Sequence, residues 1–176
     1  MPKVVKEVAA MLTARADVDD ALVIDYGVPE PILVIVKPCF FCSGPELRDA
    51  CAAALDEPAT RVVVLLATKL PRGEDKFPNL ESALSDAAYV FRYEPPVTET
   101  EERMVALWND ALERRVTGVR DDFLDLGGDS EAAVRIIAII EQEFSVEIDL
   151  TDFFDAPTVR EIAALVDACA IPDKHL

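Results

Sequence analysis

Gly127-Gly128-Asp129-Ser130 is the segment whose residue types and spacing best fit a chemical role. Two adjacent glycines let the backbone turn sharply and leave the serine uncrowded, while the residues that follow predict that Ser130 opens a helix. A phosphate ester on that hydroxyl would lie near the positive end of the helix dipole. From the residues alone, a cap made by Asp129 or Ser130 explains the segment equally well.

Other reactive side chains are few. The chain has one histidine, His175, near its C-terminus, which argues against histidine-based triads and histidine-rich metal sites. Cys39-Phe40-Phe41-Cys42 has the spacing of a redox motif, but it follows an apolar run and lacks the rest of a thioredoxin pattern, so packing cysteines are favoured. A zinc site would need Cys51 and Cys169 from distant segments.

The charge balance narrows the partners. Seventeen basic and thirty-four acidic residues give a formal net charge of −17. Such a surface repels phosphate backbones and anionic lipid, so we expect neither nucleic acid nor a membrane as a partner, and a basic patch on another protein is the natural complement. The sequence shows neither a membrane span nor a signal peptide, and we therefore expect a cytoplasmic protein with free thiols.

Glu94-Pro95-Pro96-Val97-Thr98 separates two patterns with different periods, because two prolines cannot continue a helix. We expect residues 1–93 and 99–172 to be two domains joined by a linker at 94–98. Residues 99–172 show three apolar helical faces and a short turn at Asp152-Phe153-Phe154, and predict an all-α four-helix bundle. Residues that share these faces include Met104, Leu107, Trp108, Ala111, Ala133, Ile137, Ile140, Phe144, Val159, Ile162, Val166 and Cys169.

Residues 1–93 predict a small α+β domain, in which a layer of strands is covered by helices. Helices are expected at 3–15, 44–55 and, more briefly, 80–88. Strands are expected at 21–25, 32–36 and 61–66, and the first two are expected to pair antiparallel.

The run from Asp122 to Ser130, Asp-Phe-Leu-Asp-Leu-Gly-Gly-Asp-Ser, resembles the attachment motif of peptidyl carrier (thiolation) domains in nonribosomal peptide synthetases. The resemblance covers about residues 98–170 and includes the segments 98–108 and 152–159. It implies a carrier fold with 4′-phosphopantetheine on Ser130, beside Asp129 and Gly128. It also implies a phosphopantetheinyl transferase that uses coenzyme A and magnesium, and a thioester of an amino or aryl acid on the arm.

One position departs from that pattern. The residue after the serine is usually leucine in the family and is Glu131 here. The resemblance makes Glu131, Val134 and Leu126 candidates for partner docking, and an acid at position 131 implies unusual partner choice. The alternative is that Glu131 is simply a favourable acid in the first turn of a helix. Expected partners are the transferase, an adenylating enzyme in trans, and a downstream condensation or tailoring enzyme.

Residues 4–92 resemble, more loosely, the small C-terminal subdomain of adenylate-forming enzymes. Lys69-Leu70-Pro71-Arg72-Gly73-Glu74-Asp75-Lys76 is similar to its late lysine motif with altered spacing, and Lys76 matches the lysine that contacts substrate. The family's large ATP-binding domain is not within these residues, so no adenylation activity is expected from this chain alone. The first half is then a non-catalytic docking platform, or the lid of a split adenylating ligase that uses Lys76 with a separately encoded large domain.

Overall fold

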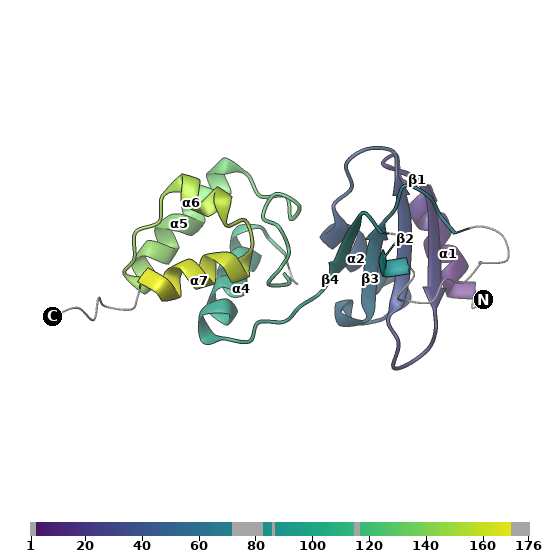
Figure 1. Cartoon of the computed structure of the whole chain (residues 1–176), viewed down its shortest axis with the longest axis horizontal. Coiled ribbons are helices and arrows are strands. Elements are labelled where there is room, and N and C mark those ends of the chain that lie inside the picture. The colour runs from purple at the N-terminus through teal and green to yellow at the C-terminus, as the bar shows by residue number, and fades with distance from the viewer. Residues whose placement is uncertain (1–2, 72–82, 86, 115–116, 170–176) are drawn as a thin grey trace. The chain divides into compact units, whose positions relative to one another are not determined.

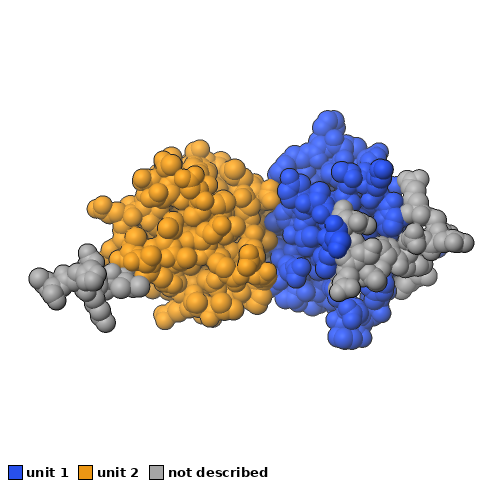
Figure 2. Space-filling view, viewed as in Figure 1, with its two compact units in different colours: residues 1–93 blue, residues 94–176 orange. Residues whose placement is uncertain are grey.

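The computed structural model describes residues 3–71, 83–85, 87–114 and 117–169. The chain forms two compact units, Met1–Tyr93 and Glu94–Leu176 (Figures 1 and 2). Each unit has its own apolar core, one built on a sheet and the other on helices only. Within the described residues, no helix is long and apolar enough to cross a membrane.

A four-stranded sheet forms the centre of the first unit (Figure 1). Its strands lie in the order β1-β2-β3-β4, with β1 and β2 antiparallel, β2 and β3 parallel, and β3 and β4 antiparallel. The elements of this unit are α1 (Lys3–Thr13), β1 (Val18–Asp25), β2 (Ile32–Pro38), α2 (Gly44–Leu55), the 3₁₀ turn η1 (Ala59–Arg61), β3 (Val62–Leu66) and β4 (Tyr89–Arg92).

The two faces of the sheet are covered differently. Helices α1 and α2 pack on one face, where Val8, Leu12 and Leu47 meet Val34 and Val64 of the central strands. On the other face the apolar side chains of β2 and β3 meet Leu70, Ala83, Leu84 and Ala87. Because both faces are covered, β2 and β3 are apolar at almost every position, as their sequences are.

Most of the predicted elements of the first unit are confirmed, including the antiparallel pair of β1 and β2. The strand β4 was not predicted. It has four residues, lies at the sheet edge and is mostly exposed, so its sequence lacks the apolar alternation of a half-buried strand. Of the helix predicted at 80–88, residues 83–85 are helical, and residues 80–82 and 86 lie outside the described part.

The second unit is a helical bundle, as predicted (Figure 1). Its helices are α4 (Glu99–Ala111), α5 (Ser130–Phe144), α6 (Leu150–Asp155) and α7 (Val159–Cys169). Trp108, Phe123 and Phe153 are fully buried and contact one another at the centre. Cys169 was placed wrongly on the buried face: it ends α7 and is exposed.

Candidate functional site

The loop that precedes α5 is fastened to the start of α7. The backbone of Asp122 bridges to Thr158, and the Phe123 N–H donates to the Pro157 carbonyl at 2.8 Å. The Asp122 carboxylate accepts the N–H of Leu124 at 2.8 Å, which closes a local turn. These bonds give the loop a fixed path toward Ser130 without regular secondary structure.

Phe123 anchors this loop in the core. Its ring packs edge-on to Trp108 and Phe153, with centroid separations of 5.4 and 5.1 Å. Leu126 is 5% exposed and also joins the core, whereas Leu124 is 56% exposed. Residues 123–126 thus include three apolar side chains, and two of them are buried in the core. Leu124 is the exception, because the turn at Asp122 directs it away from the core.

The two glycines serve different needs. Gly127 has φ +87°, a left-handed conformation in which a side chain is strained. Gly128 lies against the Phe123 ring, and a Cβ there would come within 2.4 Å of Phe123 Cζ. One glycine therefore makes the turn and the other allows the chain to pass over the aromatic core.

Ser130 is the first residue of α5, and Asp129 is its N-cap. The Asp129 carboxylate accepts the Ala132 N–H at 2.8 Å, so the helix does not use the serine hydroxyl as a cap. Ser130 is exposed, and its Oγ has no hydrogen-bond partner among the described residues. The two interpretations left open by the sequence thus separate: the aspartate caps and the serine is available.

This arrangement fits a bulky phosphate ester on Ser130. The hydroxyl lies in the first turn of a 15-residue helix, where free backbone N–H groups and the helix dipole favour an anion. Gly127 beside it has open space around the position of a Cβ. Asp129 contributes to the site by capping α5, and Gly128 contributes by packing closely against Phe123. Both roles are structural and do not depend on a phosphate ester.

Several acidic residues lie close to Ser130 in the sequence. Burial raises the pKa of Asp125, and the neighbouring charges of Asp122 and Asp121 add to the rise. Glu131 follows Ser130 with its side chain 83% exposed, and its Oε1 lies 3.9 Å from Arg135 Nη1, one turn along the helix. So exposed an ion pair contributes little to stability, which leaves the Glu131 charge available to a partner.

The three residues suggested for docking differ in exposure. Val134 is 56% exposed on α5, one turn after Ser130, and Glu131 is exposed beside the serine. Leu126, at 5% exposure, is a core residue, and its burial argues against a docking role. Leu124 is the exposed apolar residue of the loop, and only its position beside the Asp122 turn could have indicated this from sequence.

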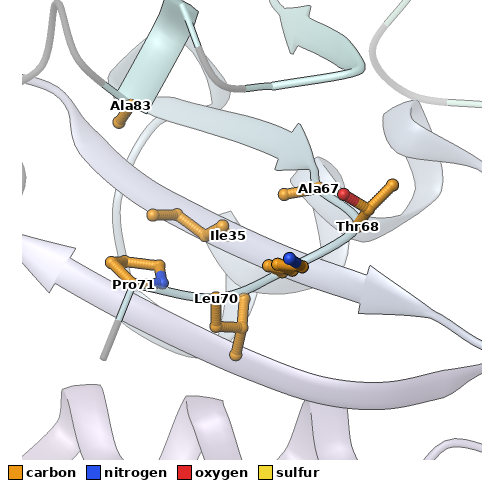
Figure 3. Close-up of a pocket in the computed structure, with 7 residues that line it drawn as sticks. Ile35, Ala67, Thr68, Leu70, Pro71 and Ala83 are labelled. Carbon is orange, nitrogen blue, oxygen red and sulfur yellow. The ribbon is translucent and has the colours of Figure 1, made fainter. Parts of the chain in front are cut away.

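The first unit contains a cavity of about 340 Å³ at the end of β3 (Figure 3). Its described lining offers mainly carbon, together with the Thr68 hydroxyl and Lys69, and includes no carboxylate, thiol or imidazole. It is lined by Ile35, Ala67, Thr68, Lys69, Leu70, Pro71 and Ala83. Lys76, the candidate adenylation lysine, lies outside the described residues.

The cysteines of the first unit lie in two environments. Cys39 is exposed, and Cys42 and Cys51 are buried. Burial raises the pKa of both buried thiols to about 11, and the Cys42 Sγ donates to the Asp17 carbonyl at 3.1 Å. In the described ranges no three histidine, cysteine or acidic side chains come together as a metal site.

Comparison with known proteins assigns the second unit. Residues 102–166 match the family described as "Phosphopantetheine attachment site". Tyrocidine synthase 2 of Brevibacillus parabrevis is 39% identical over 98 residues, which is 56% of this chain and 2% of that protein. Surfactin synthase subunit 1 of Bacillus subtilis (strain 168) is 30% identical over 127 residues, which is 70% of this chain and 4% of that protein.

A solution structure of an active-site mutant peptidyl carrier protein aligns with 49% of this chain and 96% of its own, at 26% identity and a TM-score of 0.47. Of the two synthases named above, in contrast, the chain spans only a few per cent of the length. Residues 102–166 form a phosphopantetheine-attachment domain similar to those of nonribosomal peptide synthetases, and its cofactor is covalently bound 4′-phosphopantetheine.

Proposed function

We propose that this chain is a carrier protein that holds an amino or aryl acid as a phosphopantetheine thioester on Ser130 in nonribosomal peptide or related natural-product biosynthesis. One observation supports it most: Ser130 is exposed at the start of α5 while Asp129 takes over the capping. A serine that neither packs nor caps is available for modification. The bound arm supplies the reactive thiol, and the protein provides the tether and the surface that partners recognise.

Loading of the arm needs a phosphopantetheinyl transferase. The Ser130 Oγ–phosphorus bond forms as the P–O–P bond of coenzyme A breaks, 3′,5′-ADP leaves with the bridging oxygen, and the serine proton passes to a base of the transferase. Ser130 is therefore a modification site, and no catalytic residue is assigned to this chain. The acyl group comes from an adenylating enzyme in trans and passes to a condensation or tailoring enzyme.

The docking surface proposed for these partners consists of Leu124, Glu131 and Val134. Leu124 and Val134 are each 56% exposed on either side of Ser130 in the sequence. The acidic charges of Asp122, Asp129 and Glu131 favour partners with a basic rim. Glu131 in place of an apolar residue selects for a partner cation at that point.

The first unit is proposed to be a non-catalytic docking platform derived from the C-terminal subdomain of an adenylate-forming enzyme. The match to the surfactin synthase subunit supports this origin, because it is longer than the second unit and so extends into the first. The alternative is the lid of a split adenylating ligase, with Lys76 as its catalytic lysine. The mostly exposed edge strand β4 and the exposed Phe40 and Phe41, at 78% and 73%, offer surface for a large partner.

Intact-mass analysis tests the carrier assignment. The purified chain is incubated with coenzyme A, magnesium and a phosphopantetheinyl transferase, and a gain of one phosphopantetheine group is expected. Ser130→Ala must abolish the gain, while Ser145→Ala, another exposed serine of the same unit, must not. A chain that stays unmodified with several transferases would refute the assignment.

A second experiment separates platform from lid. Loading by the adenylating enzyme is compared between the full chain and residues 94–176, and a platform predicts slower loading of the shorter chain. The lid alternative predicts that Lys76→Ala abolishes adenylate formation by the assembled enzyme without loss of binding. Equal loading and equal downstream turnover by the shorter chain would overturn the platform.

A further inference from the structure

Glu94, the first residue of the second unit, is held by three hydrogen bonds. Its carbonyl accepts the Val119 N–H at 2.9 Å. Its Oε2 accepts both Arg120 Nε and Arg160 Nη1 at 2.8 Å. Burial opposes ionisation of this carboxyl, but the two arginines outweigh it and keep the pKa of Glu94 below its usual value.

Gly118 lets the backbone of Glu94 lie close to the loop. A Cβ on Gly118 would be 3.3 Å from the Glu94 N and 3.2 Å from Asp121 Oδ2, tighter than ordinary contact. The buried Asp121 accepts the Gly118 N–H at 2.7 Å and fixes the turn in this position. An alanine at this position would push the Glu94 backbone or the Asp121 carboxylate away by a few tenths of an ångström.

The other end of the segment is also fastened. The Val97 N–H donates to Glu101 Oε2 at 2.7 Å, and Glu101 Oε1 accepts Arg160 Nε at 2.9 Å. Thr98 caps α4 by accepting the Glu101 N–H at 3.1 Å. Between these anchors stand Pro95 and Pro96, which have restricted φ and no N–H to satisfy.

Tyr93, in contrast, belongs to the first unit. The guanidinium carbon of Arg48 lies 5.7 Å from the centroid of its ring, and Arg48 is fully buried on α2. Each unit therefore holds its own side of the Tyr93–Glu94 peptide. The sequence analysis expects residues 94–98 to link the two domains. In the structure Glu94, Val97 and Thr98 form hydrogen bonds with residues of the second unit.

We propose that Glu94 is a positioning residue. Together with Gly118, Val119, Arg120 and Arg160 it fixes segment 94–98 to the loop that leads to Ser130, so that this segment belongs to the second unit and is not a flexible tether. We call these five residues the Glu94 clamp. Arg160 links the clamp to α7, and its backbone N–H also donates to the Val119 carbonyl at 3.0 Å.

The functional consequence rests on the proposed attachment at Ser130. Release of the clamp would free five residues, which at full extension adds about 17 Å of tether. Effective concentration between tethered partners depends steeply on tether length, and a short stiff connection favours a small set of encounters. The clamp would thus restrict the positions from which the arm meets its partners.

The decisive measurement is ¹⁵N relaxation with amide hydrogen exchange on the full chain. The amides of Glu94, Val97 and Thr98 should have order parameters like those of α4 and α7, about 0.85, and the Val97 and Val119 N–H groups should be protected. Order parameters below about 0.6 at Val97 in the unaltered protein would overturn the proposal. This measurement uses the unaltered protein and needs no variant.

Variants test whether the contacts of Glu94 cause the rigidity of segment 94–98. Glu94→Gln should lower the order parameters of residues 94–98, and Gly118→Ala should do so without removing a charge. Glu99→Gln, an exposed acid on α4, is the matched control and should change nothing. Trp108 fluorescence verifies that the bundle remains folded. Folded variants whose segment 94–98 stays as rigid as in the unaltered chain would refute the role of Glu94.

Distances between the units give the functional readout. Cys39 and Cys169 are the exposed thiols, one in each unit, and take spin labels without substitution, whereas Cys42 and Cys51 are buried. Glu94→Gln should broaden the distance distribution and Glu99→Gln should not; equal widths would count against the clamp. Failure of phosphopantetheine transfer to Ser130 would refute the proposed function and leave these results unchanged, so the two failures are distinguishable.

Discussion

Gly128 lies against the ring of Phe123 so closely that a Cβ at position 128 would come within 2.4 Å of Phe123 Cζ. The ring cannot retreat, because it is fully buried between Trp108 and Phe153. The residue two positions before the candidate attachment serine is therefore fixed by core packing. The packing of the core and the geometry of the site therefore depend on the same short segment.

Gly128→Ala should destabilise the second unit by about 3 kcal/mol or more, since the methyl group must displace a core ring. Gly127→Ala should cost less, about 1–2 kcal/mol, because its φ of +87° is strained for alanine but the space around it is open. Urea unfolding followed by Trp108, the only tryptophan, reports this unit specifically. A Gly128→Ala midpoint equal to that of the unaltered chain would contradict the packing argument.

Asp129→Ala should lower the stability of the second unit, whereas Ser130→Ala should abolish phosphopantetheine loading and leave stability almost unchanged. Loss of the Asp129 cap should cost about 1 kcal/mol of stability, because the Ala132 N–H loses its acceptor. Ser130→Ala should leave stability within about 0.5 kcal/mol, as for other surface substitutions, and should abolish the mass gain with coenzyme A. The same urea titration and intact-mass assay measure both, and a destabilised Ser130→Ala would return the serine to a structural role.

The sequence predicted most elements correctly because their cores follow simple periods. The apolar runs of β2 and β3 are buried, and the helical faces of α4, α5 and α7 join the core as expected, apart from Cys169, with Leu107, Ala111, Ile137 and Phe144 only partly buried. β4 escaped prediction because its pairing with β3, not its own pattern, makes it a strand. Such edge strands form because of tertiary contacts that their own sequence pattern does not reveal.

The site itself was predictable only in part. Ser130 and its two glycines stood out by type and spacing, but the cap assignment to Asp129 required coordinates, since either side chain can cap a helix. The exposure of Leu124 and the burial of Leu126 depend on the turn made by the Asp122 carboxylate. The Glu94 clamp joins residues up to 66 positions apart, which no local pattern reveals.

Glu101→Gln should destabilise the second unit at neutral pH by about 1–3 kcal/mol, because a nearly buried carboxylate that accepts from Arg160 and Val97 is lost. Burial opposes ionisation of Glu101, but these bonds outweigh it and lower the pKa of its carboxyl. A lowered carboxylate pKa gives stability that is present above the unfolded value and lost as pH falls through the folded value.

The difference between the unaltered chain and Glu101→Gln should therefore be largest near pH 7 and shrink below about pH 4.5. Trp108-monitored urea unfolding at several pH values measures it. Glu102→Gln, its exposed neighbour in the same helical turn, is the control and should show little difference at any pH. A difference that persists undiminished at pH 3 would exclude the carboxylate as its source.

The four thiols should separate into two classes. Cys39 and Cys169 are exposed and should react with a thiol reagent at pH 8 within minutes, whereas Cys42 and Cys51 should react only on unfolding. Burial, which raises the pKa of both buried thiols to about 11, leaves about one in a thousand as thiolate at that pH. Two fast and two slow equivalents in a colorimetric titration are expected; rapid reaction of all four would contradict the packing of α2 on the sheet.

Val134→Asp should weaken partner recognition without weakening the fold. Val134 is 56% exposed, so stability should change by less than about 1 kcal/mol, while an added charge in a desolvated contact should slow loading about tenfold or more. Ala164→Asp places the same charge on the exposed side of α7 and is the matched control. Loading of the holo chain by its adenylating enzyme, measured as acyl thioester formed per minute, distinguishes them. Equal rates for the two variants would contradict a docking surface on α5 and would favour one on the acidic loop before Ser130.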